Sequence, residues 1–99
     1  MELTQEKIKE IRDRSIQAYD KWHRMCRGMG SALENYKDGI LYLKIRNSES
    51  RSPSNYAVAE DFAKQWIRWN KELSNAKGFV VVFHKIPSGD LINIFSGLF

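Results

Sequence analysis

The chain of 99 residues contains a single cysteine, two prolines and no long hydrophobic run. One cysteine, Cys26, excludes an internal disulfide framework and a thiolate-based zinc site. No apolar segment approaches the roughly 20 residues that a bilayer-spanning helix needs. The start of the chain is acidic and polar, unlike a secretory signal. These absences predict one cytoplasmic domain over residues 1–99 that makes no contact with a membrane.

Motifs for nucleotides, metals and cofactors are also missing. Gly28 and Gly30 lack the third glycine of a dinucleotide fingerprint, and no Gly-Lys-Ser/Thr loop is present. The two histidines, His23 and His84, have no carboxylate at ligand spacing. We therefore expect no cofactor and no metal site. Cys26 lies beside the apolar stripe of its expected helix, which favours a buried structural cysteine over a nucleophile.

The most informative feature of the sequence is a point at which the spacing of apolar residues changes from that of a helix to that of a strand. Apolar residues recur at helical spacing over residues 56–73 and then give way to a strand-like block over residues 79–84. A helix that leads into a strand in this way indicates a helix packed on a sheet, and so an α+β fold. The helical face that we expect in the core consists of Val58, Phe62, Trp66, Trp69 and Leu73.

The remaining segments complete a predicted order of α-α-β-α-β-β. Residues 4–29 are expected to form a long helix with Thr4 as its N-cap, and the capping-box pattern of Ser31 and Glu34 predicts a short helix over residues 31–37. Strands are expected over residues 40–46 and 79–86, parallel through a right-handed crossover, with a hairpin partner over residues 91–95. This gives two long helices packed on a small three-stranded mixed sheet, whose other face is exposed and favours self-association.

Positive charge is concentrated in the middle third of the chain. Residues 21–51 carry seven basic and three acidic side chains, an excess equal to the net charge of +4 of the whole protein. Basic residues neutralise phosphates and aromatic residues stack on bases, so nucleic acid or a nucleoprotein complex is the favoured partner. A solvated basic face is the competing interpretation. The predicted contact residues are Lys21, Arg24, Arg27, Lys44, Arg46, Arg51, Lys64, Arg68 and Lys71.

The function expected from these features is that of a small non-enzymatic binding protein, with two alternatives. One is a protein-binding inhibitor or regulator of phage or viral type that acts on a host protein. The apolar tail of Phe95, Leu98 and Phe99 beside an expected edge strand motivates it, and also motivates a homodimer. The other is a small metal-independent ribonuclease, in which His84, Lys44 and Arg46 would converge from neighbouring strands, joined by Tyr42 if its face matched.

Overall fold

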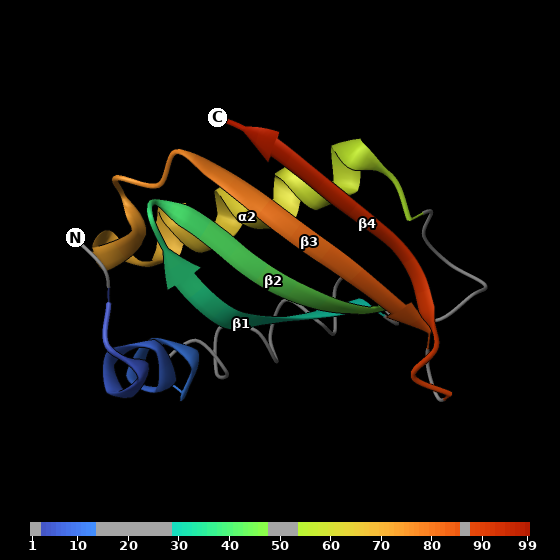
Figure 1. The fold of residues 1–99 in the computed structure, drawn as a ribbon, viewed down its shortest axis with the longest axis horizontal. Coiled ribbons are helices and arrows are strands. Elements are labelled where there is room, and N and C mark those ends of the chain that lie inside the picture. Colours follow the sequence, from blue (N-terminus) through green and yellow to red (C-terminus); the bar gives the residue numbers. More distant parts are fainter. Residues whose placement is uncertain (1–2, 14–28, 48–53, 86–87) are drawn as a thin grey trace.

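A four-stranded sheet backed by helices forms the protein in the computed structural model, which describes residues 3–13, 29–47, 54–85 and 88–99. The strands lie in the order β1-β2-β3-β4. Their bounds are Met29–Lys37 for β1, Ile40–Asn47 for β2, Gly78–Lys85 for β3 and Leu91–Leu98 for β4. Helix α2 (Tyr56–Trp69) and the 3-10 turn η1 (Lys71–Leu73) connect β2 to β3, and α2 crosses behind the sheet in Figure 1. The α+β class with a mixed sheet is confirmed, whereas the predicted three strands are four.

The additional strand is β1, so the predicted short helix over residues 31–37 is wrong. β1 pairs antiparallel with β2 through the turn Asp38-Gly39, where both residues have positive φ, 54° and 77°. A two-residue type I′ hairpin requires this backbone geometry. A bulge after Leu33 interrupts the alternation of β1. Its buried positions are therefore separated by two and then three residues, which imitates helical spacing; they are Ser31, Leu33 and Tyr36.

The predicted parallel pairing of β2 with β3 is confirmed, and so is the antiparallel β3–β4 hairpin. The hairpin turn at Gly39 sets the parallel register, because its carbonyl accepts hydrogen bonds from the backbone N–H groups of Lys77 at 2.7 Å and Gly78 at 3.3 Å. Gly78 begins β3 rather than closing the preceding helix. A Cβ atom there would lie 2.5 Å from the carbonyl oxygen of Gly97 on β4, so a side chain would push these two strands apart.

One face of the sheet carries the hydrophobic core. Alternate residues of β2 and β3 point to this side, where α2 and the N-terminal helix, described over residues 5–13, cover them. The side chains that the sheet buries here are Leu33, Tyr36, Leu41, Leu43, Ile45, Phe79, Val81 and Phe83. The helices contribute Ile8, Ile11, Ala59, Phe62, Ala63 and Trp66, and η1 contributes Leu73. Both helices therefore lie on the same side of the sheet, as the sequence predicts.

Helix α2 begins and ends at asparagines. Asn55 is the N-cap, and its side-chain oxygen accepts a 2.9 Å hydrogen bond from the backbone N–H of Val58. Asn70 leaves the helical conformation, so α2 ends at Trp69, although the helical spacing of apolar residues continues to residue 73. The prediction that both tryptophans are core residues is half correct: Trp66 is 2% exposed, but Trp69 is 36% exposed. Trp69 lies at the margin of a buried stripe that is centred on alanines and Trp66.

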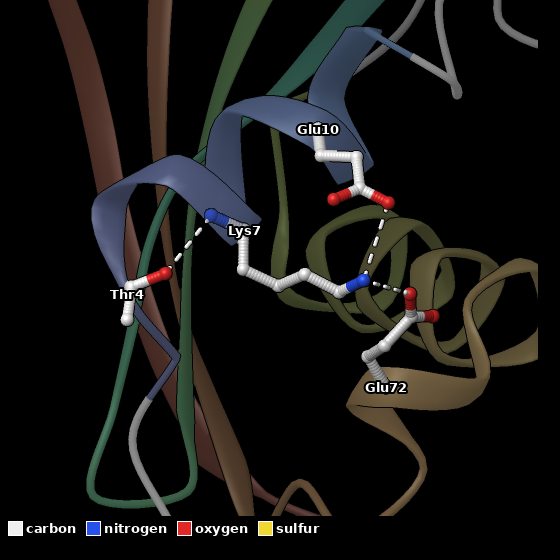
Figure 2. Close-up of polar contacts among 4 residues, drawn as sticks. All are labelled: Thr4, Lys7, Glu10 and Glu72. Carbon is white, nitrogen blue, oxygen red and sulfur yellow. Dashed lines mark hydrogen bonds and ion pairs between the residues drawn. The ribbon is translucent and has the colours of Figure 1, made fainter.

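A lysine of the N-terminal helix forms an ion pair with η1, the turn that follows α2 (Figure 2). The hydroxyl of Thr4 accepts a 3.1 Å hydrogen bond from the backbone N–H of Lys7, which confirms Thr4 as the N-cap. The ammonium group of Lys7 lies 3.2 Å from a carboxylate oxygen of Glu10 and 3.5 Å from one of Glu72 in η1. The hydrogen bond and charge of Glu10, with a smaller contribution from Glu72, raise the pKa of Lys7. Residues 14–28, which the sequence assigns mostly to the same helix, lie outside the described residues.

Replacing the buried tryptophan tests the packing of α2 on the sheet. Trp66 crosses the core and donates a 2.9 Å hydrogen bond from its indole nitrogen to the hydroxyl of Ser31 on β1. Trp66→Ala should lower the free energy of unfolding in urea by about 3–5 kcal/mol because it leaves a large cavity. Trp69→Ala is the matched control and should cost clearly less, since this side chain is 36% exposed and Trp66 only 2%. Equal losses from the two substitutions would contradict the packing described.

Candidate nucleic-acid interface

The side of the sheet opposite α2 holds the predicted site residues of β2 and β3. The alternation that buries Leu43 and Val81 on the core side directs their neighbours to this side. Parallel pairing sets them opposite one another in three rows: Tyr42 with Val80, Lys44 with Val82, and Arg46 with His84. We call this surface, made of Tyr42, Lys44, Arg46, Val80, Val82 and His84, the open face. No described helix covers it, and Arg46 is exposed while the other five side chains are half-buried.

A shallow depression of about 320 Å³ occupies the middle of the open face. Its lining residues are Tyr42, Leu43 and Lys44 of β2, Val80, Val82 and His84 of β3, and Glu34 at the bulge of the outer strand β1. The depression thus combines an apolar floor with an aromatic ring and a cation at its sides. The surface that lines the depression is almost entirely apolar, which suits the flat face of a ring, and Lys44 is the cation among its lining residues.

The orientation of His84 is set by the β3–β4 turn. Its Nδ1 lies 3.1 Å from the carbonyl oxygen of Gly89. A carbonyl oxygen can only accept a hydrogen bond, so Nδ1 donates in this contact, and the contact does not engage Nε2. The ring therefore has one nitrogen engaged by the backbone and one available to a ligand.

Among the described residues that line the depression, Glu34 is the acidic one, and an arginine offsets its charge. The guanidinium of Arg12 donates a 2.8 Å hydrogen bond from Nε to the carbonyl of Leu33, which holds it beside the bulge of β1. From there its Nη2 lies 4.0 Å from a carboxylate oxygen of Glu34. The pair is largely exposed, so its effect on stability is small. Its effect on the site is to leave Lys44 and Arg46 as the dominant charges of the open face.

The other predicted contact residues do not join this cluster. Lys64 and Arg68 are exposed on α2, on the opposite side of the sheet, and Lys71 follows in η1. Lys64 also lies 3.5 Å from a carboxylate oxygen of Glu60, which neutralises part of that surface. Lys21, Arg24, Arg27 and Arg51 lie outside the described residues. The structure thus brings Lys44, Arg46 and His84 together with Tyr42 and separates them from the lysines and arginine of the helix.

Two features of this surface are not evident from the sequence. The valines of β3 indicate an interior strand, and β3 does lie between β2 and β4, but Val80 and Val82 form the floor of the depression rather than a second core. Exposed apolar residues of β4 extend the open face beyond β3. An apolar strand face has the same composition whether it is buried or uncovered. The two cases differ only in whether a helix packs on that face.

The part of the chain that the structure describes offers no cluster of metal ligands. There, no three or more histidine, cysteine, aspartate or glutamate side chains gather in a way that would hold a metal ion. None of the helices described is long and apolar enough to cross a membrane. Comparison of the chain with protein-family models, with curated proteins and with solved structures finds no match.

Proposed function

We propose that this protein is a non-enzymatic binding protein that holds single-stranded nucleic acid on the open face of its sheet. The observation that supports this proposal is the presence of Tyr42, Lys44, Arg46 and His84 on one uncovered face of two neighbouring strands. Such a surface supplies the two interactions that bind single strands with little sequence preference, cation–phosphate attraction and stacking on aromatic rings.

Each residue of the cluster has a separate role in the proposed complex. Lys44 and Arg46 neutralise phosphates, and the side chains of Tyr42 and His84 stack on unpaired bases. Val80 lies opposite Tyr42, and Val82 lies between Val80 and His84 on the same face of β3. A duplex keeps its bases stacked inside the helix, where the side chains of a sheet face cannot stack on them. The proposed ligand is therefore a single strand, and the shared chemistry of RNA and DNA makes either acceptable to this surface.

Two charge-reversed variants of equal net charge test the placement of the ligand. Lys44→Glu combined with Arg46→Glu alters the open face, whereas Lys64→Glu combined with Arg68→Glu alters the outer face of α2. Fluorescence anisotropy with a short labelled single-stranded RNA at about 50 mM salt should show at least a tenfold loss of affinity for the first variant and a much smaller change for the second. The milder pair Lys44→Gln and Arg46→Gln should reduce the salt slope by about 1.4, near 0.7 for each phosphate that is no longer neutralised.

Two substitutions of Tyr42 test whether its ring stacks on a base. Tyr42→Ala should weaken binding by about 1–3 kcal/mol, whereas Tyr42→Phe retains the ring and should bind almost normally. Equal losses from the two charge-reversed variants would indicate attraction by net charge alone and would contradict the assignment to the open face. No binding of single- or double-stranded RNA or DNA by the wild-type protein would remove nucleic acid as the partner.

A metal-independent ribonuclease is the second candidate, favoured by the position of His84. Its available Nε2 shares the open face with Lys44 and with Arg46 directly opposite. His84 would take the proton of a ribose 2′-hydroxyl, and the two cations would stabilise the charge that develops on the phosphate. This candidate ranks second because the described part of the open face contains no second histidine to protonate the leaving oxygen.

Incubation of the protein with single-stranded RNA in the presence of a chelator tests this candidate. If the ribonuclease hypothesis is correct, the wild-type protein should cleave RNA but not DNA, which lacks the attacking hydroxyl, and His84→Ala should lose cleavage while it still binds. Cleavage that persists unchanged in His84→Ala would indicate another source of activity. If the wild-type protein leaves the RNA intact, the ribonuclease hypothesis is wrong and binding is the function that remains.

A protein partner is the third candidate, and exposed apolar residues on β4 favour it. Leu91, Ile94 and Leu98 of this edge strand offer a surface on which another chain can pack. A homodimer, or an inhibitor or regulator of phage or viral type bound to a host protein, would use such an edge. We retain the homodimer and the cytoplasmic setting as part of the proposal, the latter because a single cysteine suits a reducing compartment.

A further inference from the structure

Exposed apolar side chains gather along β4. Among the described residues, six large hydrophobic side chains are exposed, and all except Trp69 belong to β4 or lie beside it. The three on the open face, Leu91, Ile94 and Leu98, are 58%, 57% and 74% exposed. Several exposed large apolar side chains on one strand mark an interaction site more often than single exposed ones scattered over a surface do.

The other side of the same strand is apolar as well. Tyr56 at the start of α2 lies against Gly97, so closely that a side chain on Gly97 would collide with its ring. The ring of Phe99 packs 5.5 Å from that of Phe79, which attaches the end of the chain to β3. Tyr56 and Phe99 nevertheless remain exposed. The C-terminal end of β4 is thus held in place, and exposed apolar side chains lie on both of its faces.

The outer edge of β4 presents backbone groups in a defined pattern. The N–H of Phe99 donates to the carbonyl of Lys77 at 2.9 Å, so the backbone of Phe99 faces the interior of the sheet. Backbone groups alternate in direction along a strand, and those of Ile94, Ser96 and Leu98 therefore point outward. In the described part of the chain β4 is the last strand of the sheet. Residues 91–99 contain no charged side chain and no proline, the usual protections of an exposed edge.

We infer that β4 pairs antiparallel with β4 of a second copy of this chain, about a two-fold axis at Ser96. This inference rests on the proposed homodimer and specifies its seam. With Ser96 opposite the partner's Ser96, the outward backbone groups of both strands pair. Ile94 of one chain then lies opposite the partner's Leu98, and Leu98 opposite the partner's Ile94. These side chains share the open face, so both cross-strand pairs cover apolar surface that is exposed in the monomer.

Charge and symmetry favour a second copy over a foreign strand. Each chain has a net charge of +4, yet the edge that meets its partner is uncharged, so two copies approach without bringing like charges into contact. The cations of the open face lie on β2, two strands away from the seam. An interface formed by the same strand of both copies is closed at two chains and leaves no edge of β4 for a third.

The paired chains form one continuous eight-stranded sheet with both open faces on the same side. Five interstrand spacings separate the two copies of β2, a distance of about 24 Å. The apolar seam of Ile94 and Leu98 runs between the two basic clusters. A single strand of nucleic acid that crosses the seam would contact Lys44 and Arg46 of both chains, so dimerisation would strengthen the proposed function without being required for it.

Substitutions at the seam test this pairing, with mass measured by sedimentation equilibrium. The wild-type protein should have twice the monomer mass of 11.6 kDa at micromolar concentration. Ile94→Lys combined with Leu98→Lys should be monomeric, because each new ammonium group would face another across the seam. Ile94→Glu combined with Leu98→Lys should restore the dimer, since each carboxylate would then face the partner's ammonium. The exposed Asn75→Lys is the control for added charge and should remain dimeric.

Circular dichroism checks that every variant is folded. We expect all of them to fold, because Ile94 and Leu98 are exposed. A wild-type protein that stays monomeric to high micromolar concentration would overturn both the homodimer and its seam. A dimer that survives the double lysine substitution would overturn the seam alone, as would a failure of the glutamate–lysine variant to recover it. Species larger than a dimer would contradict the closed two-fold interface. None of these results bears on whether the open face binds nucleic acid.

Discussion

The parallel pairing of β2 with β3 is the constraint on which the rest of the structure depends. The carbonyl of Gly39, in the turn that ends the β1–β2 hairpin, accepts hydrogen bonds from Lys77 and Gly78 and so places the start of β3 beside the start of β2. Two parallel strands need a connection that returns across the sheet, and α2 supplies it on one side. That single crossover determines which face of the sheet becomes the core.

The opposite face follows from the same constraint. With the described helices all on one side, the residues that alternate with the core of β2 and β3 have no helix above them. Val80 and Val82 are half-buried and Ile94 and Leu98 are exposed, so this face keeps apolar surface in contact with water that further burial would stabilise. The presence of these side chains beside Lys44, Arg46, Tyr42 and His84 is the basis of the proposed ligand and second chain.

Regular periodicity made much of this fold predictable from the sequence. The apolar stripe of α2, the alternation in β2 and the turn before β4 each identified an element, and chain order then predicted the parallel pair. β1 was not predicted, because its bulge replaces the alternation of buried and exposed residues with a spacing that resembles that of a helix. Trp69 was misplaced because spacing alone does not show where the margin of a buried stripe falls or that Asn70 ends the helix.

The candidate site was predictable to a similar extent. Alternation along parallel strands was enough to suggest that Lys44, Arg46 and His84 converge. It did not show that Lys64 and Arg68 belong to the other side of the molecule, because that depends on which way the crossover packs. The depression over Val80 and Val82 could not be predicted, since an apolar strand gives no sign of whether a helix covers each of its faces.

Nuclear magnetic resonance of the isotopically labelled protein during a titration with short single-stranded RNA tests the central claim most directly. The account predicts that the signals of Tyr42, Lys44, Val82 and His84 shift together and saturably, with the methyl groups of Val80 and Val82 among the most affected. The signals of Lys64 and Arg68 on the far side of the sheet should stay nearly constant. Shifts concentrated on α2, or no shifts at all, would contradict the assignment of function to the open face.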